Sequence, residues 1–114
     1  MPYYRSETYS TAISTPSWNL DPAIVPFNAL VSVLWNGTGA VSYKLQWTPN
    51  ALDDPTHTDA ANANWFDSVD IPAATATTAH STLNAPVARI RLVIATCSGG
   101  ATLQMQARQG LSTN

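Results

Sequence analysis

The sequence has little charge, and this scarcity limits the partners that the protein can have. Charged residues make up 11% of the 114 residues, and the net charge at pH 7 is −2, whereas globular chains average about 25% charged residues. Only five side chains are basic, and affinity for nucleic acid depends on clustered lysines and arginines that neutralise phosphates. We therefore expect no nucleic-acid partner. A polar surface with few charges suits a protein that packs against others, although a neutral β-domain has the same composition.

Cysteine and long apolar runs are equally scarce. Cys97 is the one cysteine, so no disulfide can form within the chain. We interpret it as a half-buried, inert thiol, because no neighbouring histidine or carboxylate would activate it as a nucleophile. The N-terminal residues lack the apolar segment of a secretory signal, and no run approaches the ~20 apolar residues of a membrane helix. These patterns predict no membrane partner and synthesis in a reducing cytosol.

Amphipathic helices are also missing from the pattern. Eight prolines interrupt the chain, and β-branched and aromatic residues fill the intervals between them, as in strands. We predict an all-β, single-domain antiparallel β-sandwich, jelly-roll-like, with about seven or eight short strands. Residues 1–16 form an N-terminal arm or edge strand in this prediction, 17–110 the sandwich, and 111–114 a tail. The expected strands are Glu7–Ser14, Trp18–Val25, Ala29–Trp35, Val41–Trp47, Trp65–Ile71, Ala74–Thr82, Val87–Thr96 and Ala101–Gln109.

Two turns are predicted to close hairpins. Val87–Thr96 and Ala101–Gln109 alternate apolar and polar residues on either side of Gly99–Gly100, which predicts an antiparallel hairpin with one dry face. Asn36–Gly37 indicates a second hairpin, because both central positions of the matching turn need positive φ. The outer face of the C-terminal hairpin would carry the arginines Arg89, Arg91 and Arg108.

Candidate catalytic and metal-binding residues are scattered. Asp53–Asp59 is the densest group of possible metal ligands, but it lacks the glycine of a calcium loop and a nearby second histidine or cysteine for zinc. His80 lies among threonines and alanines, and no segment resembles a nucleophile elbow or a glycine-rich phosphate loop. We therefore predict that the protein is not an enzyme and has no catalytic residues, metal or cofactor. A small hydrolase or metal enzyme is the weakest alternative.

Contact residues are the stronger candidates for function. The first sixteen residues hold three tyrosines, which favours an arm that lies on a neighbouring subunit, with an edge strand of the same domain as the alternative. The near-continuous apolar run Ala29–Trp35 predicts a strand covered on both faces or a contact between subunits. The loop 48–64 is longer than most loops of compact domains. The predicted protein-interface residues are Tyr3, Tyr4, Arg5, Tyr9, Trp18, Asp53, Asp54, His57 and Trp65.

Four segments between residues 40 and 110 occur in a familiar order. A strand reading VSYKLQWT is followed by a polar loop and NWFDSV, and then by APVARIRL and a terminal ATLQMQARQG. This order resembles the small β-sandwich virion proteins of tailed bacteriophages. In those proteins a strand ends near Q-[WGS], N-W-x-[DS] follows a variable loop, and an [AP]-x-x-R-[IVL]-R strand leads to [VL]-x-[VILM]-x-x-R-Q-G. The first forty residues lie outside the resemblance.

Within that group, capsid decoration (cement) proteins are the most similar. The resemblance implies a viral structural protein on the capsid surface of the virion, made in the cytoplasm of the host, with no catalytic residues. Its implied partners are the major capsid protein and further copies of itself in a homo-oligomer, joined through many modest contacts. The alternative is a carbohydrate-binding or host-attachment module of a head fibre or tail, which would bind a surface glycan through exposed aromatic residues.

Overall fold

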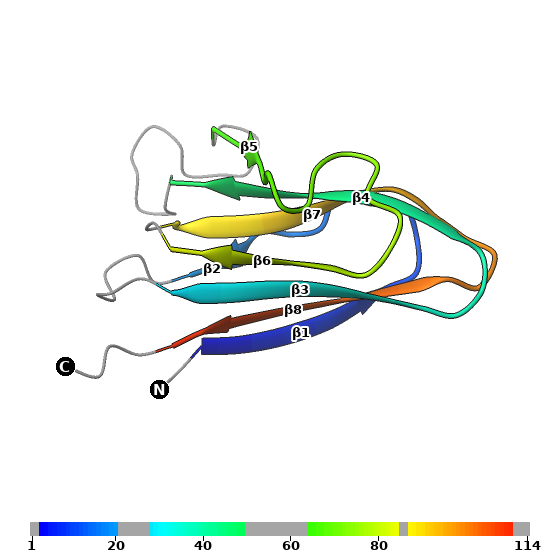
Figure 1. Cartoon of the computed structure of the whole chain (residues 1–114), viewed down its shortest axis with the longest axis horizontal. Coiled ribbons are helices and arrows are strands. Elements are labelled where there is room, and N and C mark those ends of the chain that lie inside the picture. Colours follow the sequence, from blue (N-terminus) through cyan, green and yellow to red (C-terminus); the bar gives the residue numbers. More distant parts are fainter. Residues whose placement is uncertain (1–2, 21–27, 50–63, 85–86, 111–114) are drawn as a thin grey trace.

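The chain folds into two packed β-sheets. The computed structural model describes residues 3–20, 28–49, 64–84 and 87–110. Sheet A has the strand order β1-β8-β3-β6, and sheet B has the order β2-β7-β4-β5 (Figure 1). The strands are β1 (Tyr3–Tyr9), β2 (Trp18–Asn19), β3 (Ala29–Asn36), β4 (Ala40–Thr48), β5 (Phe66–Asp67), β6 (Ala79–Leu83), β7 (Arg89–Ser98) and β8 (Thr102–Gln109).

This strand order is that of a jelly roll. All paired strands are antiparallel, and consecutive strands change sheet except at β4–β5, as in a double-sheet jelly roll built from two Greek keys. The prediction of a single-domain antiparallel sandwich is confirmed. The described residues therefore form an eight-stranded jelly-roll domain.

The core lies between the sheets and is built from alternate residues of the long strands. On β7 and β8 the apolar side chains that the alternation seen in the sequence places inward are at most 3% exposed, so the alternation identifies them correctly. Each fully buried leucine or isoleucine stabilises the fold by about 1.5–3 kcal/mol. These side chains are Ile90, Leu92, Ile94, Leu103, Met105 and Ala107.

The two glycine turns connect the sheets and do not close hairpins. β3 and β8 lie in sheet A, whereas β4 and β7 lie in sheet B, so both predicted hairpins are wrong. The alternation of apolar and polar residues identifies which face of a strand points into the core. It does not indicate whether the next strand pairs with this strand or lies opposite it in the other sheet. At the first turn the positive φ angles fall on Gly37 (85°) and Gly39 (106°), whereas a type I′ hairpin would need one at Asn36.

These two turns pack against each other at one end of the sandwich (Figure 1). The hydroxyl of Thr38 donates a 3.0 Å hydrogen bond to the main-chain oxygen of Gly99. A Cβ atom at Gly39 would overlap the main-chain oxygen of Ser98. The glycines therefore allow the two chain reversals to approach with only backbone between them.

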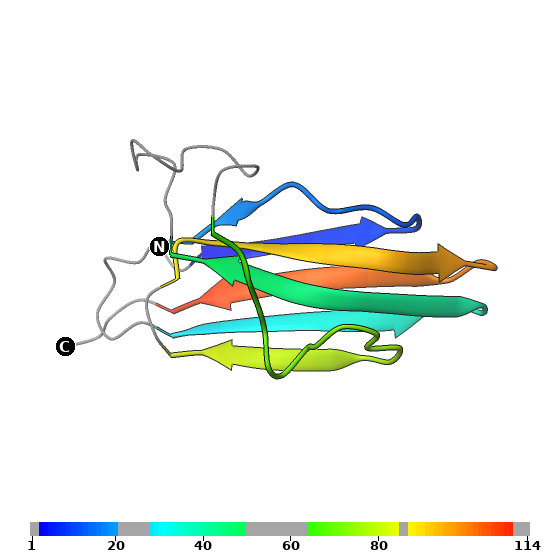
Figure 2. The same cartoon turned by 90° about the horizontal axis from the view of Figure 1, so that it is seen from above.

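The N-terminal segment forms an edge strand of its own domain. β1 pairs with β8 in continuous register from Tyr3↔Gln109 to Tyr9↔Leu103. Residues 3–9 therefore form an edge strand of the same domain, as the second of the two predictions states, and not an arm that leaves the domain. The chain then crosses to sheet B, where Thr15 donates its N–H to the main-chain oxygen of Leu92 at 2.9 Å. Figure 2 shows β1 and β2 along one side of the sandwich and β6 along the other.

Candidate functional site

The outward side chains of sheet A form a broad face with few charges. The register of β1, β8 and β3 places Tyr4, Arg108 and Leu30 in one row across the sheet. Two parallel rows follow, and they consist mainly of serine, threonine and glutamine. We call the whole surface the sheet A face, and its residues are Tyr4, Ser6, Thr8, Leu30, Ser32, Leu34, His80, Thr82, Gln104, Gln106 and Arg108.

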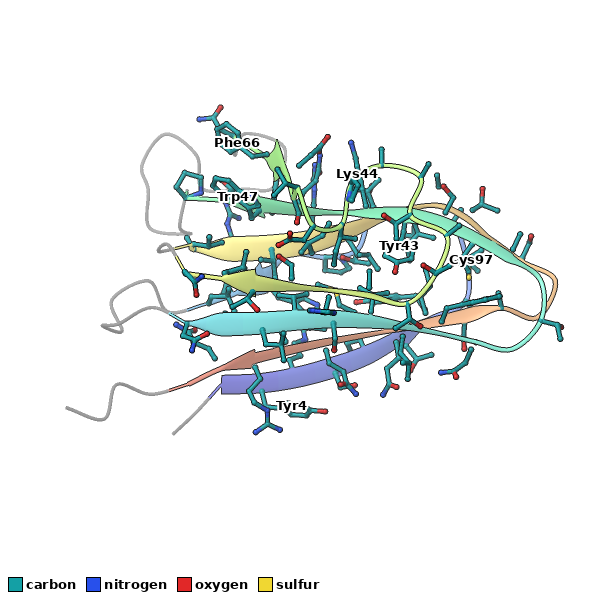
Figure 3. All side chains as sticks on the ribbon, viewed as in Figure 1. Tyr4, Tyr43, Lys44, Trp47, Phe66 and Cys97 are labelled. Carbon is teal, nitrogen blue, oxygen red and sulfur yellow. The ribbon has the colours of Figure 1, made fainter. Side chains whose placement is uncertain are left out.

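Three apolar or aromatic side chains stand out on the sheet A face. Leu30 is 45% exposed, Leu34 is 44% exposed and Tyr4 is 51% exposed, and Tyr4 lies on the side of sheet A away from sheet B (Figure 3). The guanidinium of Arg108 lies 4.8 Å from the centroid of the Tyr4 ring. The apolar run at β3 is therefore buried on its inner face alone, and the expectation that both faces are covered within the chain is wrong. The contact alternative for this run stays a prediction.

The outer face of sheet B carries a chain of polar contacts. Lys44 Nζ lies 3.3 Å from Asp67 Oδ1, and Gln46 Nε2 donates to the same oxygen at 2.8 Å. The hydrogen bond from Gln46, followed by that from Lys44, lowers the pKa of Asp67. Arg91 Nε donates to Gln46 Oε1 at 2.9 Å, and burial lowers the pKa of Arg91. The ring of Trp65 covers this arginine, with its centroid 4.2 Å from the guanidinium carbon.

The three C-terminal arginines do not share a face. Arg89 and Arg91 belong to β7 in sheet B, whereas Arg108 belongs to β8 in sheet A. The expectation of a joint basic surface is wrong for the same reason as the predicted hairpin, because the turn between β7 and β8 carries the chain to the other sheet. Arg89 is 1% exposed, with its guanidinium carbon 5.9 Å from the centroid of the Trp65 ring.

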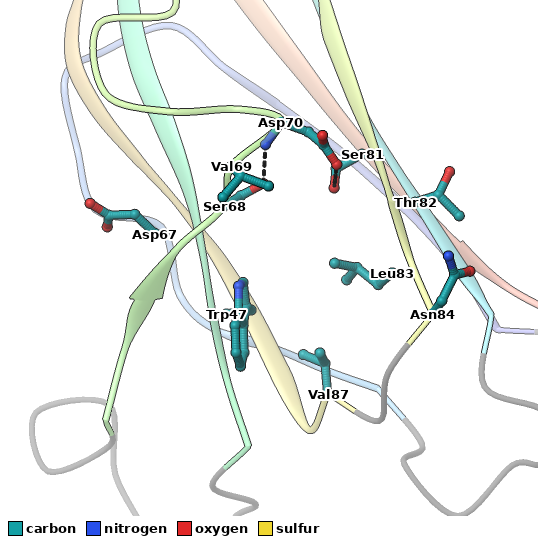
Figure 4. Close-up of a pocket in the computed structure, with 10 residues that line it drawn as sticks. All are labelled: Trp47, Asp67, Ser68, Val69, Asp70, Ser81, Thr82, Leu83, Asn84 and Val87. Atoms are coloured by element: carbon teal, nitrogen blue, oxygen red, sulfur yellow. Dashed lines mark hydrogen bonds between the residues drawn. The ribbon is translucent and has the colours of Figure 1, made fainter.

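A pocket of about 260 Å³ opens along the edge of the sandwich where β5 and β6 lie (Figure 4). Trp47, Leu83 and Val87 supply apolar walls. Phe66 is 48% exposed, and its ring stacks on that of Trp47 with ring centroids 4.9 Å apart. At the polar side, Ser81 donates a 2.9 Å hydrogen bond to Asp70 Oδ2. An aromatic platform beside a carboxylate is chemistry that suits the apolar face and hydroxyls of a sugar.

The predicted interface residues fall into four groups. Tyr3, Tyr4, Arg5 and Tyr9 lie on β1, and Trp65 lies over the arginines of sheet B. Trp18 is 0% exposed, because its position opposite Ile90 turns it into the core, so it is not a contact residue and that prediction is wrong. Asp53, Asp54 and His57 lie outside the described residues.

The titratable residues form no metal centre within the described ranges, since no three His, Cys, Asp or Glu side chains there come close enough to hold an ion. The acidic segment Asp53–Asp59 lies outside these ranges. Cys97 is buried, and its thiol donates to the main-chain oxygen of Ala101 at 3.3 Å. No helix in the part of the chain that the structure describes is long and apolar enough to cross a membrane.

Comparison with known proteins gives a structural likeness. No family model and no curated protein matches the sequence. Among solved structures, the chain is similar to one from Bacillus endospore appendages, which form a novel family of disulfide-linked pili. The sequences are 15% identical, the TM-score is 0.46, and the match covers 98% of this chain and 88% of that chain. A likeness of this size does not identify a shared function.

Proposed function

We propose that this chain is a non-enzymatic structural protein of a bacteriophage virion that binds the assembled capsid as a decoration, or cement, protein. The observation that carries the proposal is the sheet A face, where Leu30 and Leu34 are 45% and 44% exposed among mostly uncharged polar side chains, with Arg108 directly opposite Leu30. Protein interfaces combine apolar residues with a centre depleted of charge. The resemblance of residues 40–110 to phage virion proteins indicates the kind of partner.

Binding would work by removing the exposed side chains of this face from water. Each half-exposed leucine contributes about 1 kcal/mol when a capsid subunit covers it, which is half the value of a full burial. Arg108, the arginine of the sheet A face, would pair with an acidic group of the capsid subunit. One copy therefore makes a modest contact, and repetition over the shell turns many such contacts into a stable coat.

The proposal is tested by co-sedimentation of the purified protein with capsids of the phage that encodes it. The double variant Leu30→Gln/Leu34→Gln should bind at least tenfold more weakly, because a loss of about 2 kcal/mol corresponds to roughly a thirtyfold change in Kd. Its melting temperature should stay close to that of the wild type, because both side chains are already exposed.

Val69→Gln is the matched control for this experiment. Val69 is 91% exposed and lines the pocket near β5, away from the sheet A face. Its replacement therefore also exchanges an exposed apolar side chain for glutamine, but on a different surface. This control should bind capsids like the wild type. Equal binding of the wild type and the double leucine variant would contradict the proposal.

A glycan-binding module is the second candidate function, and the pocket between β5 and β6 supports it. Trp47 and Asp70 both line the pocket, Phe66 stacks on Trp47, and aromatic residues in this setting bind the apolar faces of sugars. In this case Phe66→Ala should abolish binding on a glycan array, while Leu30→Gln/Leu34→Gln should keep it. A glycan array with no ligand for the wild type would contradict this candidate.

A further inference from the structure

The outer edge of β1 is an unpaired strand edge. β1 is seven residues long and is the first strand in the order of sheet A, and no strand of the described residues pairs with its other side. Such an edge presents a row of backbone N–H and C=O groups, which can template pairing with another strand. The charged side chains of β1 are Arg5 and Glu7, and both remain accessible, with 40% and 49% of their side chains exposed.

We propose that β1 pairs with β1 of a second copy, so that two molecules join their A sheets in an antiparallel dimer. The strand reads YYRSETY and is centred on Ser6. A twofold axis through Ser6, perpendicular to the sheet, places Arg5 opposite Glu7 of the second copy, and Glu7 opposite its Arg5. Directly opposite residues in an antiparallel pair have Cβ atoms about 4.5–5.5 Å apart, which is within reach of an ion pair. The contact is isologous and closes after two copies.

The two charges also disfavour the neighbouring registers centred on residues 5 and 7. An axis through residue 5 would place Arg5 opposite Arg5, and an axis through residue 7 would place Glu7 opposite Glu7, and like charges in these positions destabilise a strand pair. An axis between two residues would oppose an inward side chain with an outward one, because successive side chains point to opposite faces. The charges that protect the edge from indiscriminate pairing thus leave the register centred on Ser6 open.

The contacts of Arg5 keep its charge at this edge. Its guanidinium lies 4.7 Å from the centroid of the Trp18 ring, and its Nε lies 3.8 Å from Glu7 Oε1 of the same strand. A second copy would convert this single ion pair into a closed set of four alternating charges across the axis. The joined sheets would have eight strands and a doubled sheet A face on one side. The dimer does not depend on the proposed function, because it needs no other partner.

The charge pattern is tested by analytical ultracentrifugation of the purified full chain without capsids. Glu7→Arg and Arg5→Glu should each weaken dimerisation at least tenfold, because each places like charges opposite one another across the axis. The double variant Arg5→Glu/Glu7→Arg restores opposite charges across the axis and should return the dimerisation constant to within about threefold of the wild type. Asp70→Arg changes the net charge as Glu7→Arg does, but at the β5–β6 pocket, and should leave the dimer intact.

The register is tested by covalent trapping. Ser6→Cys places two cysteines opposite each other on the axis, where Cα atoms are about 4.5–5.5 Å apart, a spacing compatible with a disulfide. Thr8→Cys lies on the same face, but the two copies of residue 8 would be about 14 Å apart. Oxidation should therefore link Ser6→Cys and spare Thr8→Cys, with thermal melting as a control that all variants fold.

Three results would overturn the dimer proposal. The first is a wild type that stays monomeric at about 100 μM, since a Kd above that value corresponds to a binding free energy weaker than about −5.5 kcal/mol. The second is a folded Arg5→Glu/Glu7→Arg variant whose dimerisation is not restored. The third is equal disulfide linking of Ser6→Cys and Thr8→Cys. A monomer that still co-sediments with capsids would overturn this inference and leave the proposed function standing.

Discussion

The Nε of Arg91 donates a 2.9 Å hydrogen bond to the side-chain oxygen of Gln46, which lies 45 positions earlier in the sequence. The amide nitrogen of the same Gln46 donates to Asp67 at 2.8 Å. One amide therefore connects β7 to β5 through β4, and Gln46 itself is only 9% exposed. Gln46 accepts a hydrogen bond from a cation with its oxygen and donates one to an anion with its nitrogen. These two bonds favour the order β7-β4-β5 at this point of sheet B.

Replacing Gln46 with leucine should destabilise the fold. Gln46→Leu keeps a similar volume but leaves the partly buried Arg91 without its acceptor, and we expect a loss of about 1–3 kcal/mol in the free energy of unfolding. Urea denaturation at pH 7 measures this change. Lys44→Met is the comparison, because an exposed ion pair contributes at most about 1 kcal/mol. Equal midpoints for Gln46→Leu and the wild type would show that the bridge does not contribute to stability.

The same variant should change the titration of Asp67. The hydrogen bond from Gln46 is the largest cause of the lowered pKa of this carboxyl, so the pKa should rise toward its ordinary value in Gln46→Leu, as followed by NMR. A carboxyl whose pKa is lowered by folding stabilises the folded state at pH values above its pKa in the unfolded chain. This stabilisation is lost as the pH falls through the pKa of the folded state. The difference in stability between wild type and variant should therefore narrow in acid. An unchanged titration of Asp67 would contradict the assignment.

Gly39 is the position where the backbone least tolerates a side chain. Its φ is 106°, and a Cβ atom there would overlap the main-chain oxygen of Ser98. Gly39→Ala should lower stability by about 2–4 kcal/mol, since it adds backbone strain to a steric clash between the two turns. Gly110→Ala is the control, because a Cβ at Gly110 meets no atom within 4 Å. Similar melting temperatures for the two variants would contradict the packing of the turns.

Tyr43 should make stability depend on pH in the alkaline range. Burial raises its pKa from 10.0 to about 12, and its hydroxyl donates to the main-chain oxygen of Thr77. Because the unfolded chain ionises first, this contribution is complete below pH 10 and is lost as the pH rises toward 12. Tyr43→Phe should cost about 1 kcal/mol at pH 7, and guanidinium denaturation should show this difference shrinking above pH 10 and changing sign before pH 12. A constant difference across that range would contradict the prediction.

The sequence predicts the strands better than their partners. The period-two pattern of residues 41–47 and 88–107 reports which side chains face the core, and this local property is confirmed. Whether β8 pairs with β7 or lies across from it depends on β1 and β3, which occupy the two sides of β8. A local turn sequence such as Asn36–Gly37 does not indicate which distant strands pair with the strands on either side of it. For this reason the prediction of both hairpins is wrong.

The candidate surfaces could be predicted in part. Tyr4 was predicted as a contact residue and lies exposed on the sheet A face. Leu30 and Leu34 lie in a near-continuous apolar run, so the sequence alone does not distinguish their exposed side chains from the buried ones. The alternation of buried and exposed side chains follows from the neighbouring strands. The pocket brings Trp47 beside Leu83 and Val87 at the edge of the sandwich. Its residues come from segments far apart in the sequence, so their proximity depends on the jelly-roll topology and on no local pattern.

The proposal that the sheet A face binds an assembled phage capsid has a direct test. The most direct measurement is a cryo-electron microscopy map of capsids from the encoding phage, saturated with the purified protein. We predict jelly-roll density on the outside of the shell, with Leu30, Leu34 and Arg108 facing the capsid subunits. Capsids that carry no such density, or copies that bind through the β5–β6 pocket with the sheet A face turned to solvent, would contradict the claim.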